Sequence, residues 1–153
     1  MVICGIDPGK NGGAAIIANG KVVAVASFTD GVVAAMRKVI LLEPDIYVIE
    51  KVGAQTKDGV KSAFSFGRAL GQVEGVIGNG EKFYVPPRTW QSWAGVYGCG
   101  KGKGTKQKSY EIARFVVDEA LLKGPRGGIK DGVCDAILIG FWYQENILKK
   151  TFK

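Results

Sequence analysis

The sequence opens on a short apolar segment that ends in an acidic residue, directly before a Pro-Gly pair. Residues 2–6 read Val-Ile-Cys-Gly-Ile, the composition of a strand that is buried on both faces of a sheet. Asp7 follows directly, and Pro8-Gly9 then ends the strand. A carboxylate at the tip of a buried strand requires a metal ion, a charged partner or a retained proton. Asp7 is therefore either part of a site or simply the residue that opens a turn.

The segments that follow predict an α/β protein. Residues 14–18 and 21–28 are two further apolar strands joined by the hairpin signal Asn19-Gly20, which makes an antiparallel meander. Strands are also predicted at 45–50 and 82–85, and helices at 29–42 (capped by Thr29 or Asp30), 60–77, 88–94, 105–123 (capped by Thr105) and 129–148. The stretch 98–108 alternates glycine with lysine and is predicted to be a mobile basic loop.

This order of elements predicts a five-stranded mixed sheet flanked by helices. A meander followed by two crossover units gives three antiparallel strands plus two parallel ones, with helices on both faces. The inner faces are predicted to carry Val33, Met36, Val39 and Ile40 in the first helix, and Ile112, Phe115, Val116, Ala120 and Leu121 in the 105–123 helix. With 153 residues, one domain spanning 1–153 is expected.

The absence of histidine narrows the possible chemistry. It excludes His-based nucleophilic catalysis and makes a zinc site improbable. The three cysteines have no paired spacing, no signal peptide is recognisable, and no apolar run reaches the roughly 18 residues of a membrane span, so a cytoplasmic protein is expected. A net charge of +7 favours nucleic acid as a partner before an acidic membrane, although solubility alone also explains it.

Four acidic residues from three predicted elements can meet at one edge of the sheet. Asp7 and Glu50 each end a predicted strand, and neighbouring parallel strands expose their carboxyl ends at the same edge. Asp131 and Asp135 are four residues apart and share one helical face. Such a cluster needs compensating charge, which a pair of Mg²⁺ ions would supply for displacement at phosphorus. Taken singly, each acid also fits a structural role in a turn, at a strand end or at a helix start.

Four motifs, in order along nearly the whole chain, resemble the RuvC-type Holliday junction resolvases of the ribonuclease H-like superfamily. They are GIDPG at 5–9, VIEKV at 48–52, FGRALGQVEGVI at 66–77 and DGVCDAILIG at 131–140. The short chain and the Gly-Lys stretch are most similar to phage-encoded members, which act in the cytoplasm of a bacterial host. The resemblance implies a homodimeric endonuclease that uses two Mg²⁺ ions, or Mn²⁺ in their place, to nick two strands of like polarity at a four-way DNA junction.

The resemblance also implies which residues form the site. Asp7, Glu50 and Asp135 match the family's metal ligands, and Asp131 is expected to be the fourth. Cellular members often place that additional acid one residue later, where this chain has Gly132. All four acids are therefore expected to be both metal ligands and catalytic residues.

Basic residues are expected to hold the DNA. Lys108 matches a family lysine and is the expected catalytic lysine, whereas a second family lysine is missing near Trp90-Gln91. Nearby lysines can replace the lost charge, and for each of them a merely solvated charge is an equal alternative. The expected phosphate-binding residues are Arg88, Lys101, Lys103, Lys106 and Lys108.

One departure from the family leaves other functions open. Cellular members often carry an aromatic residue three positions after the strand-end Glu, where this chain has Gly53. Without that residue, the chain can also be a nuclease for flaps, forks or RNA. A junction-binding protein that lacks catalysis is a further alternative. A sugar kinase or actin-like ATPase begins with a similar strand, but needs a much longer two-domain chain.

Overall fold

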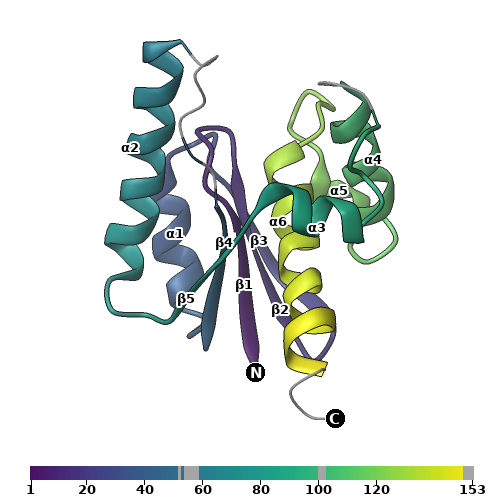
Figure 1. The fold of residues 1–153 in the computed structure, drawn as a ribbon, viewed down its shortest axis with the longest axis horizontal. Coiled ribbons are helices and arrows are strands. Elements are labelled where there is room, and N and C mark those ends of the chain that lie inside the picture. The colour runs from purple at the N-terminus through teal and green to yellow at the C-terminus, as the bar shows by residue number, and fades with distance from the viewer. Residues whose placement is uncertain (52, 54–58, 100–102, 150–153) are drawn as a thin grey trace.

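The computed structural model of the chain describes residues 1–51, 53, 59–99 and 103–149. Its centre is a mixed sheet in the order β3-β2-β1-β4-β5 (Figure 1). The meander β1–β3 is antiparallel, and β4 and β5 continue the sheet parallel to β1, which confirms the predicted fold class. The five strands are β1 (Val2–Asp7), β2 (Gly13–Ala18), β3 (Lys21–Ser27), β4 (Ile46–Glu50) and β5 (Lys82–Val85).

The register of the central strands brings two acidic residues to the same edge of the sheet. In the parallel pair of β1 and β4, Ile6 lies opposite Ile49. Asp7 and Glu50 are the next residues of these strands, so both emerge at the carboxyl edge. Residues 3–6 of β1 are buried, as expected for an apolar strand in the middle of a covered sheet.

Helices cover both faces of the sheet (Figure 1). On one face lie α1 (Val32–Ile40) and α2 (Val60–Ile77), over a core that includes Met36 and Val73. On the other face α6 (Asp131–Tyr143) packs on β1 and β2. Around α6 lie the remaining α-helices of the described chain: α3 (Pro87–Trp93), α4 (Lys103–Ala113) and α5 (Glu119–Leu122).

Helix α6 touches β1 backbone to backbone. A Cβ atom at Gly5 would stand 2.1 Å from the carbonyl oxygen of Ala136 and 2.6 Å from the amide nitrogen of Gly140. These distances are far inside van der Waals contact, so only glycine fits at position 5. The close approach holds α6 against the strand that carries Asp7.

The start of the first helix differs from the prediction. Neither Thr29 nor Asp30 caps α1, because Gly31 is its N-cap residue and no side chain caps the helix. The Thr29 hydroxyl instead shares a hydrogen bond of 2.9 Å with the hydroxyl of Ser27, inside the turn that ends β3. On the inner face, Met36 and Val39 are buried as predicted, together with Val32 and Ala35, whereas Val33 and Ile40 are only partly buried.

The predictions of a 105–123 helix and of a loop before it were also wrong in part. Helix α4 begins at Lys103, so Thr105 lies inside it, and residues 103–108 of the predicted 98–108 loop are helical. The chain leaves the helix after Ala113, and α5 begins anew where the Asp118 carboxylate accepts a hydrogen bond of 2.9 Å from the amide of Ala120. The break turns several predicted core residues toward solvent: Phe115, Val116 and Leu121 are exposed.

The last predicted helix is shorter and changes type. It begins at Asp131 rather than Ile129, and after Tyr143 it continues as a π-helical turn, η1 (Gln144–Leu148). Asp131 and Asp135 lie in its first turns, as predicted. Within the described part of the chain, no helix combines the length and the apolarity that crossing a bilayer requires.

Candidate active site

Asp7 and Glu50 are each held by one hydrogen bond at the carboxyl edge of the sheet. The amide of Gly9 donates to Asp7 Oδ1 at 3.0 Å, within the turn that follows β1. The indole Nε1 of Trp90 donates to Glu50 Oε1 at 2.9 Å. Trp90 is fully buried in α3, so the Glu50 carboxylate has a fixed donor beside it.

Helix α6 brings the other two acids to the same edge through a second contact between glycines. Gly12 and Gly132 form a parallel β-bridge, and a Cβ atom at Gly132 would lie 2.4 Å from the Cα atom of Gly12. The start of α6 therefore rests on the turn after Asp7. No side chain has room at position 132, whereas Asp131, one residue earlier, begins the helix.

The four carboxylates share one electrostatic environment. Desolvation raises the pKa of Asp7 to about 6, with a contribution from the charge of Asp131. Desolvation and the charge of Asp7 raise the pKa of Glu50 to about 8. Desolvation, followed by the charges of Asp7 and Asp131, raises the pKa of Asp135 to about 7. Asp7 therefore interacts electrostatically with Glu50, Asp131 and Asp135. Their joint role as metal ligands stays a prediction.

The donor set fits a hard cation. All four side chains offer carboxylate oxygens, which Mg²⁺ and Mn²⁺ prefer. The buried Ser109 hydroxyl lies beside Asp135 and lowers its pKa, yet neither Ser109 Oγ nor Asp135 Oδ1 completes a hydrogen bond of normal geometry with a described residue. Among the described residues, no three acidic or cysteine side chains are arranged so that they could hold a metal ion in this structure. Asp135 Oδ1 is nevertheless buried without a hydrogen-bond partner in the described part of the chain, and a bound cation would satisfy it.

Lys106 is the basic residue that reaches the acids. Its Nζ atom lies 2.6 Å from Asp131 Oδ2, and this pairing raises the pKa of Lys106. The positive charge of Lys106 in turn offsets a small part of the rise in the pKa of Asp7 and of Asp135. This lysine supplies part of the compensation that the cluster needs.

The other predicted basic residues lie at different places. Among the described contacts, the Lys108 Nζ atom donates to Cys99 Sγ at 3.3 Å and to none of the four carboxylates. The Arg88 guanidinium lies over the ring of Tyr97, 5.1 Å from its centroid. Lys103 is the first residue of α4, and Lys101 lies outside the described residues.

Two neighbours of the acids were missed from the sequence. Trp90 was assigned only to a short helix, and Ser109 was not assigned to the site. A serine directly after the family-like Lys108 was a usable signal, since a small hydroxyl there faces the same way as the core residues of its helix. The Trp90 contact with Glu50 joins residues 40 apart in the chain, and no local pattern indicates it.

We expect the metal-free protein to lose stability as the pH rises from about 4 to about 8. A carboxyl whose pKa is raised by folding keeps its proton in the native state after the unfolded chain has released it, so the free energy of unfolding falls across this range. Asp135→Asn removes one such group and should raise the free energy of unfolding at pH 8 by roughly 2 kcal/mol, with little change near pH 4. Denaturation in EDTA at both pH values measures this.

The matched control is Asp30→Asn, which alters an exposed acid on the turn before α1. It should leave the pH dependence of stability as in the wild type. An Asp135→Asn protein that gains the same amount at pH 4 as at pH 8 would show that the Asp135 carboxyl is not held protonated by the fold.

Comparison with known proteins supports the fold. No protein-family model and no curated protein sequence matches the chain. Among solved structures, the chain is similar to Thermus thermophilus RuvC in complex with a Holliday junction substrate, with a TM-score of 0.64 and 17% identity over 95% of this chain and 96% of that one. A second Thermus thermophilus RuvC structure gives a TM-score of 0.62 and 18% identity, with the same coverage. The chain therefore has a RuvC-like, ribonuclease H-like fold.

Proposed function

We propose that this chain is a metal-dependent endonuclease that resolves four-way DNA junctions by paired nicks. The observation that carries the proposal is the electrostatic interaction of Asp7, at the end of β1, with Glu50 at the end of β4 and with Asp131 and Asp135 in the first turns of α6. Two of these acids come from neighbouring strands and two from the helix that packs on them. The likeness to a RuvC structure with a Holliday junction substrate supports a branched DNA as the substrate.

The four acids would hold two Mg²⁺ ions, for which Mn²⁺ can substitute. When bound, such ions supply an activated water and stabilise the leaving oxygen during phosphodiester hydrolysis. The chain itself orients the ligands, because Trp90 fixes one oxygen of Glu50 and the amide of Gly9 fixes one oxygen of Asp7. Lys106 is placed to exchange its contact with Asp131 for a phosphate oxygen of the DNA.

Basic residues on the α6 side of the sheet would bind the DNA backbone. Arg88 on α3 and Lys108 on α4 are both exposed and lie on the α6 side of the sheet. Contacts of this kind neutralise phosphates and release counterions, so binding should weaken steeply with salt. We assign Lys108 to phosphate binding, because its described contact is with Cys99 rather than with the acids.

A homodimer would place two such sites on one junction. The outward face of α2 fits a second copy: Val60 is 89% exposed, Phe64 is 74% exposed, and a Cβ atom at Gly67, Gly71 or Gly75 would meet nothing within 4 Å. A smooth face of this kind permits close approach by a neighbouring helix. Two symmetric sites would account for cutting two strands in one encounter.

The test is side-by-side digestion of end-labelled substrates with Mg²⁺, with Mn²⁺ and with chelator. We expect paired, metal-dependent nicks across an immobile four-way junction and little cutting of linear duplex. Equal cutting of flaps and forks would favour a broader branched-DNA nuclease, which Gly53 in place of an aromatic wedge allows. Tight junction binding without cutting in either metal would leave a DNA-binding protein without catalysis.

We expect Trp90→Phe to slow junction cutting roughly tenfold, because it keeps the ring but removes the donor to Glu50. Loss of that hydrogen bond raises the pKa of Glu50 further, so the pH–rate profile should also shift to higher pH. Single-turnover nicking rates between pH 6 and pH 9 measure both effects. Trp93→Phe, on the same helix but 41% exposed, is the control and should cut like the wild type. A Trp90→Phe enzyme with an unshifted profile would count against a role for the indole.

A further inference from the structure

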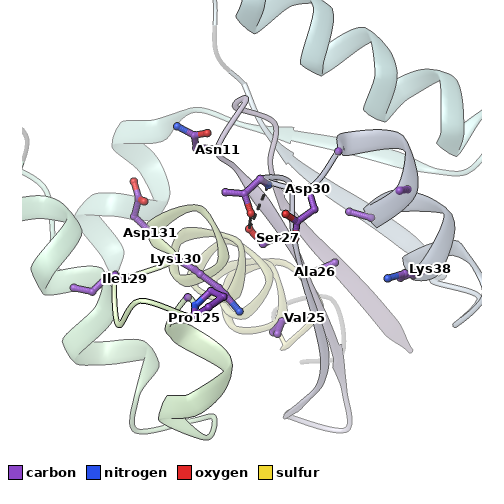
Figure 2. A pocket seen from close by; sticks show the side chains of 16 residues that line it. Asn11, Val25, Ala26, Ser27, Asp30, Lys38, Pro125, Ile129, Lys130 and Asp131 are labelled. Atoms are coloured by element: carbon purple, nitrogen blue, oxygen red, sulfur yellow. Dashed lines mark hydrogen bonds between the residues drawn. The ribbon is translucent and has the colours of Figure 1, made fainter.

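Beside the acids lies a groove that the sequence did not predict (Figure 2). Its first part, of about 700 Å³, lies between β3, α1 and the 124–131 segment. Asn11 and Asp131 lie at one end of this part in Figure 2, and Lys38 of α1 lies at the opposite end. Asp131 belongs to the carboxylate cluster, so the groove begins at the candidate active site.

The groove continues across the turn before α1 toward α2. A second hollow of about 420 Å³ shares Asn11, Thr29 and Gly31 with the first. One wall of it is the first turn of α1, which no side chain caps. The other wall is the part of α2 that carries Ser65, Arg68 and Gln72. The two hollows adjoin at these shared residues, and together they are called the groove below.

The charges along this groove are mainly positive. Lys10 and Arg68 line the second hollow and are exposed, as is Lys38 in the first. Lys130 also lines the first hollow, where its Nζ atom donates to the carbonyl oxygen of Leu121 at 3.4 Å. Between them stand hydroxyl and amide side chains that can donate to phosphate oxygens. The acidic residues among the lining side chains are Asp30 and Asp131.

We propose that this groove binds the sugar–phosphate backbone of the cut DNA strand beyond the scissile phosphate, with Lys38, Lys10 and Arg68 as its phosphate contacts. The inference rests on the proposed nuclease function, because it takes the scissile phosphate to lie at the carboxylates. Exposed lysine and arginine side chains along an open groove can each bind one phosphate of a DNA strand. Contacts with phosphates do not involve the bases, so this binding would be independent of sequence.

The groove would contact the DNA strand on the side of the sheet opposite to α6. Arg88 and α4 lie on the α6 side of the sheet, whereas α1 and α2 lie on the opposite side (Figure 1). With only the α6 side engaged, the DNA would be held on one side of the cut. The groove holds it on the other side as well, so the scissile phosphate is positioned from both directions.

The test compares two double variants in binding to a four-way junction in EDTA, across a range of salt. The groove variant is Lys38→Ala with Arg68→Ala. The control is Lys21→Ala with Arg37→Ala, which removes the same charge from exposed residues outside the groove; Arg37 is the neighbour of Lys38 on α1. The groove variant should weaken binding roughly tenfold near physiological salt and reduce the slope of log K against log salt by about 2. The control should stay within about twofold of the wild type.

A third variant gains affinity, which misfolding cannot imitate. Asp30→Lys replaces an exposed acid of the groove with a cation and should tighten binding several-fold. If both double variants weakened junction binding equally, or if Asp30→Lys did not tighten it, the proposed role of the groove would be wrong. A wild-type protein that binds and cuts the junction while the groove variants change nothing refutes this inference alone. A wild type that does neither refutes the proposed function.

Discussion

Asp7→Asn should abolish junction cutting while the protein still binds the junction. The substitution keeps the size of the side chain but removes the charge at the tip of the central strand. Asp7 interacts electrostatically with Glu50, Asp131 and Asp135, so its loss removes the expected metal ligand that these three acids have in common as a neighbour. We expect the single-turnover nicking rate to fall about 10³-fold or more, which corresponds to about 4 kcal/mol of transition-state stabilisation. Binding in EDTA should stay within about threefold of the wild type.

The matched control for this substitution is Asp118→Asn. Asp118 is the N-cap residue of α5, outside the carboxylate cluster, and asparagine caps a helix about as well as aspartate. This variant should cut at the wild-type rate. If Asp7→Asn cut as fast as the wild type, Asp7 would not belong to the metal site.

Gly5→Ala should destabilise the fold by about 3 kcal/mol or more. The added methyl group would collide with the backbone of α6 at Ala136 and Gly140, and backbone atoms cannot rotate away as a side-chain tip can. Helix α6 must then move off β1, which also shifts Asp135 away from Asp7. Chemical denaturation measures the stability, and the nicking rate of the remaining folded protein measures the displacement of the site.

Gly128→Ala is the control for this effect of glycine. A Cβ atom at Gly128 would meet nothing within 4 Å, and the backbone there has no positive φ, so the change should alter stability by less than about 0.5 kcal/mol. A Gly5→Ala protein as stable as the control would mean that α6 does not rest on β1 as described.

The sheet could be predicted from the sequence because its signals are local. Strand β1 ends at a Pro-Gly break, β2 and β3 are joined at Asn19-Gly20, and both crossover strands are short apolar runs. The two strand-end acids followed from that topology, since parallel neighbours expose the same edge. Placing Asp131 and Asp135 beside them needed the further assumption that the last helix packs on the central strand.

The parts that sequence reasoning missed depend on two short-range contacts that composition does not reveal and on one assembly of distant segments. Glycine at 104 suggested a loop, but a Cβ atom there would stand 2.2 Å from the carbonyl oxygen of Cys99, so it marks a close approach between the start of α4 and Cys99, which precedes the helix. Helical periodicity across 105–123 continued through the break after Ala113, beyond which α5 begins at its N-cap Asp118. The groove beside Asp131 is instead assembled from distant segments, namely β3, α1, α2 and a loop far along the chain.

The location of bound metal tests the central claim most directly. Crystals of the protein grown with Mn²⁺ can be measured at the manganese absorption edge, where anomalous scattering identifies each ion without reference to activity. We predict two anomalous peaks at the carboxyl edge of the sheet, within coordination distance of Asp7, Glu50, Asp131 and Asp135, and their loss in Asp7→Asn crystals. Manganese bound elsewhere, or absent from these carboxylates under conditions in which the protein cuts junctions, would contradict the account.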